Sequence, residues 1–463
     1  MKTNINKVVT INVFSTVLLK TISAITAPII SRLLGAENYG IISVYTSCVL
    51  IIGIIFGLQT VGTFAIARGV YEEAEQNSYQ ASCMGLTILS YVLMTLVVLL
   101  INTVCPIIND LDNELLLLAI VQAFGTCCIG MINSKFTYEY KPTNNLIISL
   151  LVAVSVSVLS IALIYFWPNE NNYYGRIYGF VIVYLIAGII VPLYYYRVGV
   201  SFFDIKYWKF CLPLSIPIIA HSLSSVVMGN CDILMLKWLT NNKAVGIYGL
   251  AAGFSGIILT VQASLNNSWI AFYFDFLKNK KYEELYSHGK NYLFLFTGIV
   301  FGFLLISAPV YKVYASQEFW DGITLFWGFI IGYYFSFLYA FPANFEFFCQ
   351  NTRVIAVSTF LAAIVNIVFN YYFISLWESL GAVIATAIAN VFLYLFHHYA
   401  ATHWMGTEKY PYNFCFFLPF VVALLIFGII YPHIVDKTWL CMFLAVIDGL
   451  YLLFRIKIKK ALI

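Results

Sequence analysis

Apolar blocks of roughly 20 residues follow one another along almost the whole chain. An α-helix of that length is about 30 Å long, which matches the hydrocarbon core of a lipid bilayer. Charged residues make up 10% of the chain and hydrophobic residues 62%, whereas about a quarter of the residues in a soluble domain are charged. The sequence therefore predicts an all-α integral membrane protein.

Polar breaks divide the chain into fourteen candidate transmembrane helices. Their approximate limits are 8–31, 41–66, 81–105, 114–134, 145–167, 177–196, 212–236, 245–271, 291–313, 322–345, 354–376, 381–405, 415–434 and 439–454. The first block, which contains Lys20, is longer than the apolar region of a signal peptide, so we expect it to be a retained helix. The outer loops between these helices are short, which leaves no room for a catalytic domain outside the membrane.

The basic residues predict the orientation of the chain. With fourteen helices both termini lie on one side, and that side holds eighteen lysines and arginines. The opposite side holds six, which are Arg32, Arg176, Lys237, Lys243, Lys312 and Lys437. Loops rich in lysine and arginine stay in the cytoplasm. We therefore expect both termini to be cytoplasmic.

Four glycines indicate an internal repeat. Gly40 and Gly175 are 135 residues apart, Gly246 and Gly381 are also 135 apart, and the two pairs are offset by 206. Six helices, an even number, precede the second copy, so the two halves share one orientation and we expect a pseudo-two-fold axis along the membrane normal. The expected domains are two six-helix bundles, 1–211 and 212–410, followed by two additional helices and a basic tail, 411–463.

Three segments carry a resemblance to a known family. They are PIISRLLGAENYGI at 28–41, a stretch that begins at Pro213 and includes DILML at 232–236 and GIY at 246–248, and a stretch with NTR at 351–353 and GAVIAT at 381–386. Together they resemble the Wzx-type polysaccharide flippases of the multidrug/oligosaccharidyl-lipid/polysaccharide exporter superfamily. One departure is Ile233, since this family often has a basic residue directly after the aspartate that corresponds to Asp232.

The resemblance implies a transporter and not an enzyme. Such a protein moves an undecaprenyl-diphosphate-linked oligosaccharide from the cytoplasmic to the outer leaflet of the bacterial inner membrane by alternating access, for O-antigen, capsule or exopolysaccharide synthesis. Its expected partners are the polyprenyl-diphosphate-linked glycan, membrane lipid, a polysaccharide polymerase and glycosyltransferases, with no nucleic acid. We expect no cofactor and no metal. Because the sequence has no ATP-binding motif, a proton or sodium gradient is expected to drive transport.

Three basic residues are candidate contacts for the anionic diphosphate. An unpaired charge in hydrocarbon is costly, so a cation at membrane depth points to a polar cavity or to a partner. Lys20 lies deep in the first helix and either faces a central cavity or pairs with a carboxylate. Arg32 and Lys237 occupy matching places at the outer ends of the first and seventh helices, where they contact substrate or anchor the chain at lipid head groups.

Asp232, inside the seventh helix, is the candidate for ion coupling, with pairing to Lys237 as the structural alternative. His221 is a further candidate substrate contact, with hydrogen-bonded packing as the alternative. Gln59, Asn266 and Asn267 are candidate contacts for sugar hydroxyls, with hydrogen bonds between helices as the alternative. Histidines 397, 398 and 403 are poorly spaced for a metal site, so we expect them at the membrane interface.

Two other functions remain open from the sequence. A multidrug or cation exporter of the same superfamily would need a cavity that attracts cations. A membrane polymerase or ligase that acts on lipid-linked glycans would usually carry a large outer loop with catalytic residues. Deep acidic residues are scarce and the outer loops are short, so the sequence favours the flippase.

Overall fold

The computed structural model describes residues 5–104, 113–167, 169–199, 201–405 and 409–459. These residues are almost entirely helical, which confirms the predicted all-α membrane fold. They form two compact units, Met1–Val227 and Met228–Ile463, whose boundary falls inside helix α7. Lys2, Cys105 and Lys460 lie outside the described residues. The division at 211/212 and the axis between the bundles stay predictions.

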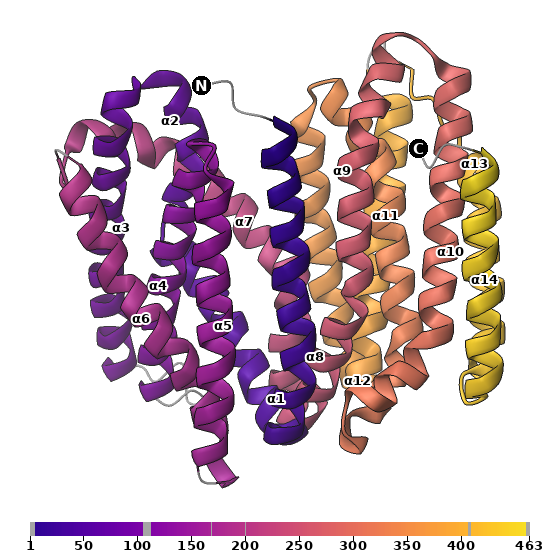
Figure 1. Ribbon diagram of the computed structural model, residues 1–463, viewed down its shortest axis with the longest axis horizontal. Helices are drawn as coiled ribbons and strands as arrows, with labels where there is room; N and C mark the ends of the chain where they lie inside the picture. Colours follow the sequence, from indigo (N-terminus) through magenta and orange to yellow (C-terminus); the bar gives the residue numbers. More distant parts are fainter. Residues whose placement is uncertain (1–4, 105–112, 168, 200, 406–408, 460–463) are drawn as a thin grey trace. The chain divides into compact units, whose positions relative to one another are not determined.

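Unit 1 contains helices that come from the first half of the chain (Figure 1). They are α1 (Ile5–Phe56), η1 (Thr60–Thr63), α2 (Phe64–Val70), α3 (Glu73–Val104), α4 (Asn113–Tyr138), α5 (Pro142–Phe166), η2 (Asn169–Asn171), α6 (Tyr173–Val198) and the first part of α7 (Ile205–Leu239). Helices α1, α4, α5 and α6 pack on one another. Their shared core includes Tyr45, Ala123 and Ile177, all almost fully buried.

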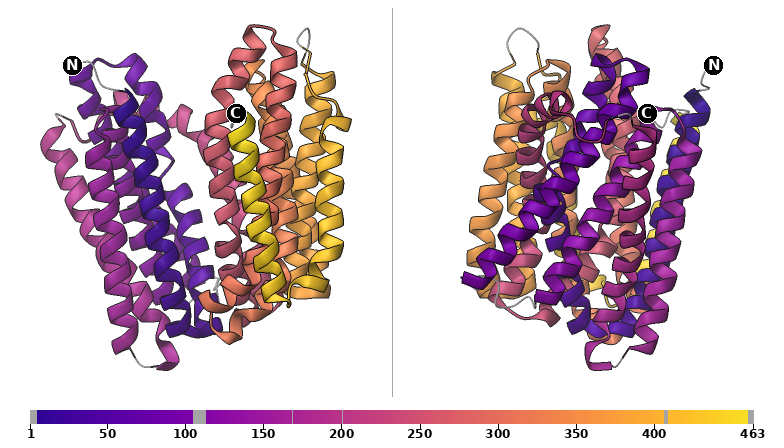
Figure 2. Two further views of the ribbon diagram at one scale, coloured as in Figure 1. Left: turned by 45° about the vertical axis from the view of Figure 1, so that its right-hand side comes forward. Right: turned by 90° about the vertical axis from the view of Figure 1, so that its left-hand side faces the viewer.

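Unit 2 contains the rest of α7 and the later helices (Figure 2). They are α8 (Asn242–Ser255), α9 (Ile257–Lys278), α10 (Tyr282–Tyr314), η3 (Gln317–Leu325), α11 (Phe326–Phe348), α12 (Thr352–His403), α13 (Phe414–Ile434) and α14 (Thr438–Lys459). Helix α11 packs along α12, and α14 packs along α10. Trp439, Phe443 and Leu453 on α14 are exposed, as expected for side chains that face lipid.

Twelve helical segments in the described ranges are long and apolar enough to cross a membrane. Two of them belong to α1 and α12, each 52 residues long, which as a straight helix would measure about 78 Å. Both are broken by non-helical residues, α1 at Gly35 and α12 at Trp377 and Glu378. Counted as two segments each, α1 and α12 bring the candidate crossings among the described residues to about fourteen.

The two halves repeat a contact between corresponding turns. In unit 1 the Asn172 side chain before α6 donates to the Leu33 carbonyl at the turn of α1, at 2.8 Å. In unit 2 the Ser379 hydroxyl at the turn of α12 donates to the Ala244 carbonyl in α8, at 3.2 Å. These pairs are 139 and 135 residues apart in the sequence. The loops that the glycine spacing matched are thus joined in the same way in each half.

Gly175 and Gly381 show why the repeat needs glycine. A Cβ on Gly175 would lie 2.6 Å from the backbone nitrogen of Ile164, and one on Gly381 would lie 2.0 Å from the carbonyl oxygen of Phe373. In each half the helix after the loop approaches the helix before it closely enough to exclude any side chain. The close approach fixes where the first turns of α6 and of the second segment of α12 lie.

Candidate functional site

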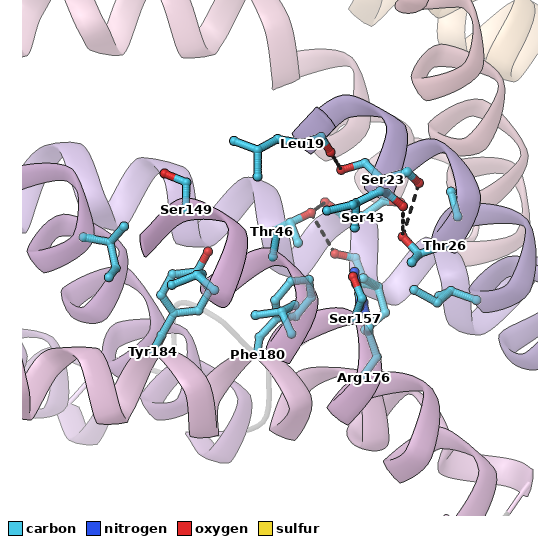
Figure 3. Close-up of a pocket in the computed structure, with 18 of the residues that line it drawn as sticks. Leu19, Ser23, Thr26, Ser43, Thr46, Ser149, Ser157, Arg176, Phe180 and Tyr184 are labelled. Carbon is cyan, nitrogen blue, oxygen red and sulfur yellow. Dashed lines mark hydrogen bonds between the residues drawn. The ribbon is translucent and has the colours of Figure 1, made fainter. Parts of the chain in front are cut away.

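A cavity of about 520 Å³ opens inside unit 1 (Figure 3). Both segments of α1 line it because the break at Gly35 turns the second segment back along the first, and α5, α6 and Ile129 of α4 complete the wall. Most of its polar lining is hydroxyl groups. These belong to Ser23, Thr26, Tyr39, Ser43, Thr46, Ser149, Ser157 and Tyr184. None of the described residues that line this cavity is acidic.

Arg176 is the only cation among the described residues that line the cavity. It follows Gly175 in the first turn of α6, and Figure 3 shows its side chain directed toward Ser43 and Ser157. The guanidinium carbon lies 4.1 Å from the ring centroid of Phe180. Its Nη1 group is buried and has no hydrogen-bond partner in the described part of the chain. A cation with a buried and unused donor favours an anionic ligand.

The hydroxyl groups of α1 can accept hydrogen bonds from a ligand or donate hydrogen bonds to it. Thr26 donates to the Ile22 carbonyl, Ser43 donates to the Tyr39 carbonyl and Thr46 donates to the Ile42 carbonyl, each at 2.9 Å. These bonds to the residue four positions earlier in the same helix leave the oxygen lone pairs free. Each hydroxyl can also rotate toward a ligand, since the carbonyl already accepts a helical hydrogen bond. The wall therefore suits a hydroxyl-rich molecule.

Unit 2 holds the second polar centre, around Asp232 of α7. The carboxylate is 3% exposed and accepts from Asn370 Nδ2 at 2.6 Å, from the Thr386 hydroxyl at 2.6 Å and from the Tyr248 hydroxyl at 2.5 Å. Asn366 extends the network by accepting from Asn370 at 3.1 Å. No described lysine or arginine lies within ion-pair distance of this carboxylate, so the suggested pairing with Lys237 is not formed.

The structure places the other predicted site residues as follows. Lys20, Arg32, His221 and Asn267 are exposed, and Lys237 is half-buried. Gln59 has a left-handed backbone, with a φ of 48°, at the turn before η1. Asn266 accepts from Asn344 Nδ2 at 3.0 Å, which is a contact between α9 and α11. None of these residues lines the cavity in unit 1, and their roles in transport stay predictions.

Sequence reasoning missed Arg176 as a site residue. It was counted only among the six basic residues of the outer side. A signal was present, because Gly175 is one of the four repeat glycines and the residue after the corresponding Gly381 is Ala382. A cation in one half of a repeat where the other half has alanine indicates a role particular to that half. The rotation of α6 that turns Arg176 inward is set by packing and was not visible in the sequence.

The expectation of an interfacial role for His397 was wrong. Its side chain is fully buried and contacts Glu346. Helix α11, which carries Glu346, packs tightly against α12 and covers this histidine. No group of three or more histidine, cysteine or acidic side chains suited to a metal ion occurs among the described residues.

Residues 5–270, more than half of the chain, match the family described as Polysaccharide biosynthesis protein. A relative with similar sequence is Lsg locus putative protein 1 of Haemophilus influenzae, which is 21% identical over 300 residues. The matched region covers 63% of this chain and 69% of that relative. The resemblance to polysaccharide flippases noted in the sequence agrees with this family.

Two solved structures share the fold. Lipid II flippase MurJ in an inward closed conformation has a TM-score of 0.70 at 15% identity and covers 96% of this chain and 99% of its own. A multidrug resistance MATE family transporter of the MOP superfamily, in an inward-facing conformation, has a TM-score of 0.61 at 15% identity, with coverages of 84% and 96%. At such low identity these likenesses establish the architecture of MOP transporters and not the cargo. The family match covers more than half of the chain, and this chain therefore belongs to the polysaccharide biosynthesis protein family.

Proposed function

We propose that this protein is a flippase that moves an undecaprenyl-diphosphate-linked oligosaccharide from the cytoplasmic to the outer leaflet of the bacterial inner membrane. The observation that carries the proposal is the cavity of unit 1, where Arg176 has an unused donor and the other polar groups are mostly hydroxyls. A diphosphate needs a cation in a region of low dielectric, and a glycan needs hydrogen-bond partners in place of water. The cavity supplies both.

The same lining argues against the two alternatives. A cation exporter would place its positive cargo beside Arg176, and no carboxylate in the described lining would offset that repulsion. A polymerase or ligase needs a general base to activate the attacking hydroxyl, and the described residues of the lining include no carboxylate or histidine to serve as one. The flippase requires only binding and release, which this lining allows.

Asp232 is the residue to which we assign ion coupling. Its three donors are neutral, so the carboxylate keeps a full negative charge when it is ionised, and a proton or a sodium ion is the simplest group to neutralise it. A proton or sodium gradient would then drive alternating access. We keep Lys20, Arg32, Gln59, His221, Lys237, Asn266 and Asn267 as proposed contacts along the substrate path. Both termini are proposed to be cytoplasmic.

The test is transport by the full chain in proteoliposomes. A fluorescent polyprenyl-diphosphate-linked disaccharide in the bilayer is quenched from outside by dithionite, and the rate at which the inner-leaflet pool becomes quenchable measures flipping. Arg176→Gln should slow flipping at least about tenfold, because a lost hydrogen bond to a charged group costs about 1.5–3 kcal/mol. Arg176→Lys keeps the charge and should retain part of the rate.

A matched control is Arg353→Gln, since Arg353 is an exposed residue at the start of α12 and lies outside the cavity. Efflux of the organic cation tetraphenylphosphonium is measured in the same vesicles. Flipping that proceeds at the wild-type rate in Arg176→Gln would refute the role of this cavity. Gradient-driven efflux of tetraphenylphosphonium without flipping would replace the flippase by the cation exporter.

A further inference from the structure

Three polar side chains meet deep inside unit 2, away from Asp232. Glu346 lies near the end of α11, Ser358 lies on the first segment of α12 and His397 lies on its second segment. All three are fully buried, with 0% exposure. They therefore link three membrane-crossing segments. Such groups are rare inside a membrane protein and usually mark a function, since their burial is unfavourable.

The contacts define where the hydrogens lie on one side of the imidazole ring. His397 Nδ1 is 2.8 Å from one carboxylate oxygen of Glu346 and 2.7 Å from the other. An ionised carboxylate only accepts hydrogen bonds, so Nδ1 carries a hydrogen. The other ring nitrogen, Nε2, faces the hydroxyl of Ser358. Nε2 is consequently the atom that gains or loses a proton.

The Ser358 hydroxyl has two places to donate. Besides facing Nε2, its Oγ is 3.0 Å from the backbone carbonyl of Ile355. When the imidazole is neutral, the hydroxyl donates to Nε2. When Nε2 is protonated, it donates to Oγ, and the hydroxyl turns to donate to Ile355. One rotation about a C–O bond thus accommodates one proton, and Nε2 and the Ser358 hydroxyl keep a hydrogen-bond partner in both states.

Protonation of His397 is what balances the negative charge of Glu346. No described lysine or arginine lies within ion-pair distance of its carboxylate. Among the described residues, the other titratable groups that face the centre are phenols. Tyr339 of α11 has its ring centroid 4.6 Å from that of His397, and Tyr410, which follows α12, lies within electrostatic range of Glu346. Both phenols are neutral, so with His397 neutral the centre has a net charge of −1 and with His397 protonated it has none.

We propose that Glu346, His397 and Ser358 form a site that binds one proton. This site is separate from the hydrogen-bond network around Asp232. That network lies nearer the break at Trp377 and Glu378, where the two segments of α12 meet. Ser358 and Asn370 are twelve residues apart on the first segment of α12, which is about 18 Å along a helix. The two centres thus lie toward opposite ends of the same pair of helices.

Loss of the proton should loosen this part of the fold. An uncompensated carboxylate would then be buried between α11 and the two segments of α12, which is unfavourable in a low dielectric. The protonated site therefore stabilises the packing of these three segments. Transport should therefore be slower when the site has lost its proton.

The direct test is nitrogen-15 NMR of the histidine rings in the full chain in lipid nanodiscs. The chain has six histidines, and the His397 signal is identified with His397→Gln or, if that variant does not fold, by elimination of the other five. Across a pH series, the His397 ring should pass from a form with both nitrogens protonated to a form in which only Nδ1 is protonated. A His397 ring that stays in one protonation state throughout would overturn the proposal.

Two variants separate proton binding from packing. Glu346→Gln keeps the shape of the side chain but removes its charge, so His397 should become neutral at a pH at which it is protonated in the wild type. Glu284→Gln, at an exposed glutamate on α10, should leave the titration unchanged. If the titration is the same in Glu346→Gln as in the wild type, the charge of Glu346 does not favour the protonated form of His397 and the site is refuted. These measurements do not depend on which molecule the protein transports.

Discussion

Arg176 lies over the ring of Phe180, one helical turn further along α6, with 4.1 Å between the guanidinium carbon and the ring centroid. The ring holds the cation at the wall of the cavity without neutralising it, because a cation–π contact leaves the N–H donors free. Arg176 can therefore be ordered before a ligand arrives. An ordered side chain loses less conformational entropy on binding, and this increases affinity.

Phe180→Leu should weaken substrate binding without abolishing it. A cation–π contact contributes about 0.5–2 kcal/mol, so the substrate concentration for half-maximal flipping should rise about 2-fold to 30-fold. The maximal rate should change less, since the charge of Arg176 remains. The matched control is Phe166→Leu, at a side chain that is 81% exposed. Equal half-maximal concentrations in Phe180→Leu and wild type would mean that the ring does not position Arg176.

Asp232→Asn should uncouple transport from its gradient and lower stability. Asparagine presents one acceptor and one donor group where the Tyr248, Thr386 and Asn370 donors converge, so at least one buried donor loses its partner, at a cost of about 1–3 kcal/mol. The melting temperature should fall, and a sodium or proton gradient should no longer accelerate flipping. Asp436→Asn is the control, since Asp436 is 89% exposed. Full gradient stimulation in Asp232→Asn would exclude this residue from coupling.

Gly381→Ala should be more damaging than an ordinary substitution of glycine in a helix. The added Cβ would meet the Phe373 carbonyl oxygen at 2.0 Å, so the two segments of α12 would have to move apart, at a cost of about 1–3 kcal/mol or more. Gly130→Ala is the comparison, because a Cβ there meets nothing within 4 Å and alanine favours the helix by up to about 1 kcal/mol. Thermal unfolding in detergent measures both. Equal melting temperatures for the two variants would contradict the close packing of this hairpin.

Glu139, just after the end of α4, forms ion pairs that we expect to be sensitive to acid. Its carboxylate lies 2.8 Å from Lys135 Nζ and 2.7 Å from Lys141 Nζ. Burial raises the pKa of Glu139, but hydrogen bonds from Lys135 and Lys141 outweigh it and hold this pKa below its ordinary value. A lowered folded-state pKa means that the ion pairs stabilise the fold above the unfolded-state value, and that this stability is lost as the pH falls through the folded-state value.

The melting temperatures of wild type and Glu139→Gln should therefore differ at neutral pH and converge below about pH 4. The difference should be small, corresponding to about 1 kcal/mol or less, because the carboxylate is partly exposed. Glu170→Gln, at an exposed residue of η2, serves as the control. A difference that grows on acidification would contradict the assigned direction.

The sequence by itself determined the class of protein, the candidate membrane-spanning segments and the repeated spacing of glycines. These depend on composition within short windows, since a block of about 20 apolar residues crosses a bilayer whatever its neighbours are. The glycines at 40, 175, 246 and 381 revealed the repeat because their role is also local. Each marks a turn where the following helix begins, and the close approach at Gly175 and Gly381 leaves no space for another residue type.

Only the tertiary structure decided which polar side chains meet. Asp232 and Thr386 are 154 residues apart and Glu346 and His397 are 51 apart, yet each pair is in direct contact. In a membrane helix nearly every face is apolar, so hydropathy does not reveal which face turns inward. The rotation of each helix is set by packing against its neighbours, and that rotation turned Arg176 into a cavity and buried His397 against a carboxylate.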